Sequence, residues 1–255
     1  MQYDLMISGV GGQGVLSMAW VLDHAAQQAG LYLKQSEVHG MAQRGGAVSA
    51  SVRLSSQAVA SDLIAQGSAR MVMAVEPLEA LRHTGVLAPD GWVVTDITPL
   101  VNQDNYPALD DLYRVLFGLP RVLALDATRL AQQAGNVKAQ NMVVLGAAAS
   151  QLPLPPVALQ SQIEALFAGK GPRIVQANVR AFQSGLELGR LGSALLQARV
   201  PPQRVCRVLS RMTAPAQALT APQVLAWQQR LLASDAEALT LTLFASDDCV
   251  SPESP

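Results

Sequence analysis

Residues 3–15 read YDLMISGVGGQGV, an apolar stretch followed closely by glycines. The pattern predicts a β-strand over 3–8, and Gly9, Gly11 and Gly14 then follow in the G-x-G-x-x-G spacing before an amphipathic helix over 15–29. Glycines permit a tight turn there, and the first turn of a helix offers free N–H groups to an anion. A strand, a glycine turn and a helix in this order are typical of nucleotide-binding α/β domains.

Strands and helices alternate through the next part of the chain. Further strands are predicted over 31–34, 47–54, 71–75, 92–95 and 121–125, and helices from 77, over 138–151, over 157–167 and over 174–191. This alternation predicts a Rossmann-like α/β fold, in which a mostly parallel sheet carries helices on both faces.

The composition changes beyond Gly192, where Pro201, Pro202 and Pro215 interrupt the pattern. We therefore expect two parts, a Rossmann-like domain over 1–191 and a C-terminal extension over 192–255. The extension should be partly helical, with a short helix over 222–233 and a disordered end over 247–255. A chain shortened to end at Leu191 is expected to fold by itself.

Charge is sparse in this sequence and shows no clustering. Charged residues make up 15% of the 255 positions, against about 25% in typical soluble domains, and the net charge is −1. Scattered lysines and arginines argue against a nucleic-acid or membrane-surface partner. The apolar runs fall short of the ~20 residues of a membrane span, and the start shows no signal peptide, so we expect a cytoplasmic protein. Little polar surface also suggests that a protein partner covers part of the chain.

Metal-binding residues are few and dispersed. Cys206 and Cys249 are the two cysteines, and neither belongs to a C-x-x-C motif. His24, His39 and His83 are far apart in the sequence. The chain should therefore hold no iron–sulfur cluster and no other metal ion by itself.

The glycine turn has three possible interpretations. It is a tight structural turn, an anion or cofactor-phosphate site, or part of a true NAD site. Glu37 follows Gly14 by about the 20 residues that separate a ribose-binding carboxylate from the fingerprint. Val15 and Leu16 stand where a phosphate-binding lysine would be expected, which excludes Walker-type chemistry.

A second unusual segment covers residues 35–46, which read QSEVHGMAQRGG and are predicted as an ordered loop. Glycines let the backbone approach another surface closely, an arginine there can contact a carboxylate or phosphate with two hydrogen bonds, and a histidine can titrate near neutrality. The candidate contact residues are Glu37, His39, Met41, Gln43 and Arg44. The alternative is a solvated loop with no partner.

Together, segments 9–15 and 36–46 resemble the paired signature of the gamma-type domain of 2-oxoacid:ferredoxin oxidoreductases. Segments 76–81, 141–147 and 178–182 agree with it, and the resemblance covers about residues 1–190. Within that family, a separate chain of this type is similar to the beta subunit of indolepyruvate ferredoxin oxidoreductase.

The resemblance implies a non-catalytic subunit that packs on a catalytic alpha subunit. Such complexes decarboxylate a 2-oxoacid, pass electrons to ferredoxin and transfer the acyl group to coenzyme A. Thiamine diphosphate, Mg²⁺ and [4Fe–4S] clusters are then expected in the partner, and the isolated chain should be inactive. The resemblance implies no catalytic residue here, and it implies that the glycine turn faces coenzyme A or a phosphate through Gly9, Gly11, Gly12, Gln13 and Gly14.

One alternative function comes from a different class. The chain could be a stand-alone nucleotide-binding Rossmann module or an NAD-dependent dehydrogenase domain. That interpretation predicts that the purified monomer retains its cofactor, and a dehydrogenase would also need a substrate domain.

Replacing Arg44 with alanine tests the interpretation of segment 35–46 as a contact surface. A charge-assisted contact to the partner or to coenzyme A contributes roughly 1.5–3 kcal/mol, so affinity should fall about 10- to 150-fold. Arg44→Lys should restore part of the loss, because lysine keeps the charge and lacks the planar fork. The melting temperature of the isolated chain should barely change. An Arg44→Ala chain that melts earlier and binds normally would favour an internal role for Arg44, for example a pair with Glu37.

Overall fold

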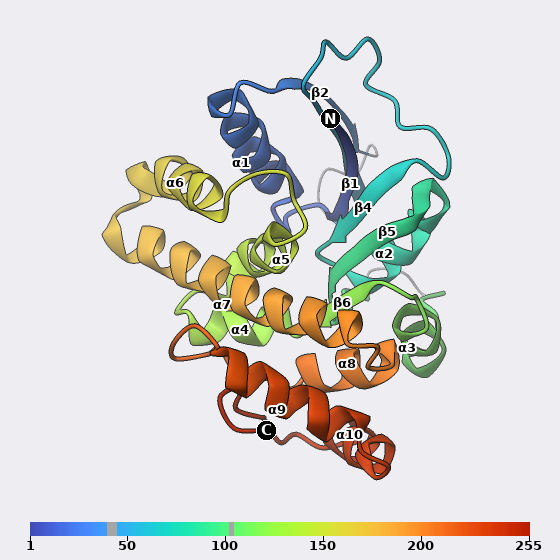
Figure 1. Cartoon of the computed structure of the whole chain (residues 1–255). Helices are drawn as coiled ribbons and strands as arrows, with labels where there is room; N and C mark the ends of the chain where they lie inside the picture. The colour runs from blue at the N-terminus through green and yellow to red at the C-terminus, as the bar shows by residue number, and fades with distance from the viewer. Residues whose placement is uncertain (40–44, 102–104) are drawn as a thin grey trace.

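The computed structural model describes residues 1–39, 45–101 and 105–255. Its centre is a sheet whose strands lie in the order β2-β3-β1-β4-β5-β6 (Figure 1). The strand bounds are Gln2–Val10 for β1, Tyr32–His39 for β2, Ala47–Ser55 for β3, Ala69–Ala74 for β4, Leu87–Asp96 for β5 and Val122–Leu125 for β6. The predicted α/β fold with a mostly parallel sheet is confirmed.

Three neighbouring pairs, β1 with β4, β4 with β5 and β5 with β6, are parallel. Strand β3 is antiparallel to both of its neighbours, β1 and β2. Because β3 follows β2 through a short connection and then pairs with β1, it separates β2 from β1. The first two strands of the chain, β1 and β2, are therefore not neighbours in the sheet.

The prediction of a loop over 35–46 is wrong for its first part. Strand β2 continues to His39, and Gln35, Glu37 and His39 pair with residues of β3. A hydroxyl contact of 2.9 Å between Ser36 Oγ and Ser51 Oγ joins the same strands. Polar side chains are compatible with a strand here because β2 lies at the edge of the sheet, where one side of the backbone and part of each face meet water.

Helices cover both faces of the sheet, as predicted. Helices α1 (Val15–Gln28), α4 (Ala127–Gln133), α5 (Gln140–Ala149), α6 (Pro156–Phe167) and α7 (Pro172–Gln197) contribute to one apolar core, and α2 (Pro77–Arg82) and α3 (Leu109–Phe117) contribute to the other. Alternation along β1 explains the division: Leu5 and Ile7 are buried in the first core, while Met6 packs against the second. Short 3-10 turns lie at Thr84–Val86, Val137–Ala139 and Ala168–Lys170.

Helices α5 and α7 are in direct backbone contact. A Cβ atom added to Gly146 of α5 would lie 2.0 Å from the carbonyl oxygen of Phe182 in α7. Glycine is therefore required at this position for the helices to approach so closely. Figure 1 shows α5 beneath the start of α1.

The C-terminal extension belongs to the same packed body. Helix α7 ends at Gln197, so the predicted boundary at 191 lies inside a helix. Helix α8 (Pro202–Leu209) packs on β6, with Val205 and Leu209 fully buried and the Cys206 thiol 3.7 Å from the carbonyl oxygen of Val122. Helices α9 (Ala221–Leu232), close to the predicted 222–233, and α10 (Ala236–Ala245) follow.

The end of the chain was expected to be disordered, and the structure packs it instead. Val250 pairs with Met212 in an isolated bridge, and the indole N–H of Trp227 donates to the carbonyl oxygen of Pro252 over 2.8 Å. Buried Trp227 therefore fixes a segment whose own composition does not predict order. None of the helices within the described ranges has the length and apolar content that crossing a membrane requires.

Shortening the chain at Leu191 should abolish its cooperative thermal unfolding. The cut removes Leu195, Val205, Val208 and Leu209 from the core. Each such side chain contributes about 1.5–3 kcal/mol, and together they approach the ~5–15 kcal/mol that stabilises a whole domain. A chain that ends at Pro215 keeps α8 on β6 and should still unfold cooperatively, at a lower temperature. Calorimetry of the two chains checks this, and a sharp transition in the shorter one would show that residues 1–191 fold alone.

Candidate functional site

The glycine turn lies at the carboxyl edge of the parallel strands, where the direction of the chain crossover changes. Helix α1 follows β1 onto one face of the sheet, and α2 follows the neighbouring β4 onto the other. In open α/β sheets, ligands bind in the crevice outside such a pair of strands. The predicted site residues after β1 therefore stand at the expected place in the fold.

The shape of the turn is fixed by α5. Gly14 precedes α1 with a φ of +82°, a left-handed conformation that favours glycine. The buried side chain of Asn141, in α5, donates from Nδ2 to the carbonyl oxygen of Gly14 over 3.1 Å. A Cβ on Gly14 would lie 2.4 Å from that Nδ2 atom, so the side chain of Asn141 lies where any larger residue would project.

The side chain of Gln13 spans the crevice between β1 and the segment after β4. Its Oε1 accepts from the backbone N–H of Val10 over 2.7 Å, and its Nε2 donates to the carbonyl oxygen of Val75 over 3.2 Å. Both ends of the amide are thus engaged within the chain. Gln13 thereby ties the turn after β1 to the segment that follows the next parallel strand.

A cavity of about 380 Å³ lies beside the turn. Its walls are Val10, Gly11, Gly12, Gly14, Val15, Leu16 and Val48. These lining residues carry no charge. The N–H groups of Ser17 and Met18 donate to the carbonyl oxygen of Gly14 over 3.1 and 3.2 Å, so within the first turn of α1 it is the N–H groups of Val15 and Leu16 that have no intrahelical acceptor. The N–H of Gly11 donates to the carbonyl oxygen of Gly46 over 2.8 Å, which joins the turn to the residue before β3. The arrangement offers backbone donors beside an apolar wall.

Glu37 does not lie where a ribose-binding carboxylate would. It is exposed on β2, two strands away from β1, which is roughly 9–10 Å across the sheet. Its Oε1 accepts from Gln35 Nε2 over 2.7 Å. Together with the position of Gln13, this removes the support for an NAD site.

The structure describes only part of the other candidate contact residues. The backbone of His39 ends β2 opposite Val48, near the cavity. Its side chain, and Met41, Gln43 and Arg44, lie outside the described residues. Of the predicted turn residues, Gly11, Gly12 and Gly14 line the cavity, whereas Gly9 and Gln13 do not. The ligand contact of the turn and the partner-facing role of 35–46 both stay predictions.

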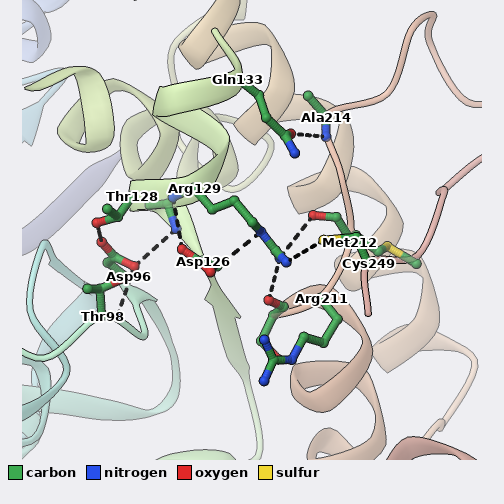
Figure 2. A network of polar contacts seen from close by, with 12 residues as sticks. Asp96, Thr98, Asp126, Thr128, Arg129, Gln133, Arg211, Met212, Ala214 and Cys249 are labelled. Carbon is green, nitrogen blue, oxygen red and sulfur yellow. Dashed lines mark hydrogen bonds and ion pairs between the residues drawn. The ribbon is translucent and has the colours of Figure 1, made fainter. Parts of the chain in front are cut away.

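A second polar cluster at the same edge was not predicted (Figure 2). Asp96 ends β5 and is buried, and one of its oxygens, Oδ1, accepts from the N–H groups of Thr98 and Ala127 at 3.0 Å each. Its Oδ2 accepts from the Thr128 hydroxyl over 2.9 Å. Burial raises the pKa of Asp96 to about 7 in spite of these donors. The sequence pattern that could have predicted this cluster is an aspartate after each of two apolar segments, Asp96 after 92–95 and Asp126 after 121–125.

Arg129 extends this cluster to the C-terminal extension. Its Nη2 donates to the carbonyl oxygen of Ser210 over 2.7 Å, and its Nη1 contacts Cys249 Sγ at 2.9 Å. Its Nε lies 3.5 Å from the carboxylate of Asp126. Figure 2 shows this arginine between the end of β6 and the extension. The cluster joins residues 210–212 and 249 to the carboxyl edge of the sheet.

Clusters of side chains that could bind a metal ion are absent from the part of the chain that the structure describes. No three His, Cys, Asp or Glu side chains come together there in a way that could hold an ion. Cys206 is buried and Cys249 is exposed, and both are free thiols.

Replacing Asp96 with asparagine should stabilise the chain at pH 8 and flatten its pH profile. Because the pKa is raised, the folded chain keeps a proton that the unfolded chain releases, so the stability contributed by Asp96 falls as pH rises from about 4 to about 7. Asparagine keeps Oδ1 as the acceptor and can donate from Nδ2 to Thr128, whose hydroxyl can turn to Gln140 Oε1 at 3.2 Å. Denaturant unfolding from pH 4 to 8 measures the effect. Exposed Asp110→Asn is the control, and an unchanged slope in Asp96→Asn would contradict the assignment.

Comparison with known proteins agrees with this geometry. The model of the pyruvate ferredoxin/flavodoxin oxidoreductase family matches residues 4–188. The indolepyruvate oxidoreductase subunit IorB of Thermococcus kodakarensis is 35% identical over 198 residues, which cover 74% of this chain and 96% of that protein.

Two solved structures share the fold. The pyruvate oxidoreductase subunit PORC from Thermotoga maritima is 23% identical, with a TM-score of 0.56, over 73% of this chain and 96% of that one. The 2-oxoglutarate:ferredoxin oxidoreductase from Magnetococcus marinus, with 2-oxoglutarate, coenzyme A and succinyl-CoA bound, is 20% identical, with a TM-score of 0.59, over 74% of this chain and 31% of that one. The family model matches most of this sequence, and the Thermococcus relative aligns along nearly the whole of its own length. The chain therefore belongs to the pyruvate ferredoxin/flavodoxin oxidoreductase family.

Proposed function

We propose that this chain is the small, non-catalytic subunit of a 2-oxoacid:ferredoxin oxidoreductase whose substrate is indolepyruvate or a related arylpyruvate. The observation that carries the proposal is the 35% identity to the IorB subunit along 96% of that protein. The subunit packs on a catalytic alpha subunit, and the complex delivers electrons to ferredoxin. In the cell we expect it in the cytoplasm.

The cofactors belong to the partner in this proposal. Thiamine diphosphate with Mg²⁺ supplies the electron sink for decarboxylation, and [4Fe–4S] clusters carry the electrons away. A cluster needs about four cysteine thiolates, whereas this chain contains Cys206, buried against β6, and Cys249, next to Arg129. Neither is placed to share a cluster with the other residues of this chain.

The cavity at the glycine turn supports a proposed contact with part of coenzyme A. The start of α1 can donate N–H groups to a phosphate oxygen, and Val10, Val15 and Val48 form an apolar wall for an uncharged part of the molecule. The lining residues include no cation, so a phosphate would need one from elsewhere. We propose that segment 35–46 supplies it through Arg44, in contact with the partner subunit. Binding of coenzyme A to the isolated chain should therefore be weak.

In this proposal, this chain supports the coenzyme A site that it shares with the partner subunit. Gln13 and Asn141 hold the turn in one conformation, so the N–H groups are positioned before any ligand arrives. We further propose that residues 1–191 form the unit shared with the family and that 192–255 are an addition that packs on it.

Co-expression with the thiamine-dependent catalytic subunit encoded in the same genome tests the proposal. The two chains should purify as one complex that reduces ferredoxin when indolepyruvate and coenzyme A are both present. This chain alone should show no turnover. Comparing kcat/KM for indolepyruvate, pyruvate and 2-oxoglutarate tests the substrate. Separate elution of the two chains would contradict the subunit role, and a preference for 2-oxoglutarate would contradict the arylpyruvate assignment alone.

A further inference from the structure

A second cavity, of about 520 Å³, lies between the part of the chain that matches the family and the C-terminal extension. Helices α6 and α7 and the end of α4 form one side of it, and residues 214–218 of the extension form the other. Ligand sites in proteins commonly measure about 300–1,000 Å³. None of the described residues that line this cavity belongs to the glycine turn, so the two cavities are separate.

Residues 214–218 are fixed to the helices on both sides of the cavity. The N–H of Ala214 donates to Gln133 Oε1 over 2.9 Å, a contact that Figure 2 shows. The N–H of Leu219 donates to Glu187 Oε2 over 3.3 Å. The cavity is therefore formed before a ligand arrives, which reduces the ordering that binding has to impose.

Arg180 is the one cation among the described residues that line this cavity. Its Nε and Nη2 donate to the carbonyl oxygen of Ala134, at the end of α4, over 3.1 and 2.7 Å. These two hydrogen bonds hold the guanidinium plane in one orientation, and Nη1 has no acceptor in the described part of the chain. Because Arg180 is exposed, an anion can reach it from solvent without any opening of the fold.

Glu187 is the one carboxylate among the same described lining residues, and its charge is already paired. Its Oε1 accepts from Arg190 Nη1 over 2.7 Å, and its Oε2 accepts from the backbone of Leu219. Arg190 itself does not line the cavity. The charge that remains unpaired in the cavity is therefore positive.

Two side-chain amides add hydrogen-bonding groups to the cavity. Gln133 uses its Oε1 for the N–H of Ala214, so its Nε2 is a donor without an acceptor in the described chain. Gln183 donates from Nε2 to Gln160 Oε1 over 3.1 Å, which leaves its own Oε1 as an acceptor. The cavity thus offers one charged donor, one neutral donor and one acceptor.

A carboxylate matches these groups because its two oxygens can accept from a guanidinium and from an amide N–H. The alanine side chains of 214–218, with Leu186, give an apolar wall that a free phosphate would leave uncovered. We infer that this cavity binds a small organic carboxylate with an uncharged body, with Arg180 and Gln133 as the donors. Residues 214–218 lie beyond the family match, which ends at residue 188. The site is independent of the proposed function, since neither a partner subunit nor coenzyme A takes part in it.

Calorimetric titration of the full chain with 3-methylbutanoate and with phenylacetate tests the site. The two monoanions carry an aliphatic and an aromatic body, and at least one should bind saturably. Phenylacetamide, the uncharged counterpart of phenylacetate, should bind at least about 10-fold more weakly than the tighter carboxylate. Absence of binding of both carboxylates at about 10 mM would overturn the site, and so would an equal affinity for the amide.

Gln133→Glu separates ligand binding from folding. Glutamate keeps an oxygen that accepts from the N–H of Ala214, but it removes the free donor and adds a negative charge. Carboxylate affinity should fall about 10- to 100-fold. Gln132→Glu is the matched control, because Gln132 is the exposed neighbour on α4 and lies outside the cavity. The two variants should melt at similar temperatures, and a Gln133→Glu chain that binds like wild type would contradict the assignment.

Replacing Arg180 tests the charged donor. Arg180→Gln should weaken carboxylate binding about 10- to 100-fold, and Arg180→Lys should weaken it less because lysine keeps the charge. Arg173→Gln, exposed on the same helix and outside the cavity, should bind like wild type. Inorganic phosphate is the competing anion. If phosphate binds as tightly as the carboxylates and depends equally on Arg180, the cavity is a general anion site and the carboxylate assignment is wrong.

Discussion

The backbone contact between α5 and α7 determines where the candidate site is held. Gly146 lets the two helices touch, and the first turn of α5 then places Asn141 against the carbonyl oxygen of Gly14. The amide of Asn141 and the left-handed φ of Gly14 select one conformation of the turn. A loop beside a cavity would otherwise sample several conformations, so the rigidity of the site originates in helices far away in the sequence.

A second constraint is the antiparallel strand between β1 and β2. In a standard crossover β1 and β2 would be neighbours, but here β3 lies between them. Strand β2 therefore lies at the edge of the sheet. Glu37 moves away from the turn as a result, and Gln13 occupies the crevice between β1 and β4. The same glycine spacing that serves dinucleotides elsewhere therefore stands here beside a crevice that a side chain of this chain bridges. The spacing of glycines alone does not distinguish these two arrangements.

Much of the fold could be predicted because apolar alternation is strong in the shared part. The strand over 71–75 and the helix over 157–167 lie within two residues of β4 and α6. Strand β2 was cut short because Gln35, Ser36 and Glu37 look like loop residues and only their pairing with β3 makes them a strand. Helix α8 was missed because two prolines suggest a break, whereas Pro202 occupies the first helical turn, where its missing N–H costs nothing. The location of the turn followed from its motif, but the roles of Gln13, Asp96 and Arg129 depend on Val75, Thr128 and Ser210, which only the folded chain brings close.

The exposed edge of β2 has a consequence for the behaviour of the free chain. Tyr32 and Val38 are 54% and 67% exposed on a strand with a regular register, and Lys34 is its single lysine or arginine. An edge of this kind can serve as a template for intermolecular pairing and aggregation. The risk rises with the concentration of free chain, and the charges of Lys34 and Glu37 are the features of β2 that oppose such pairing.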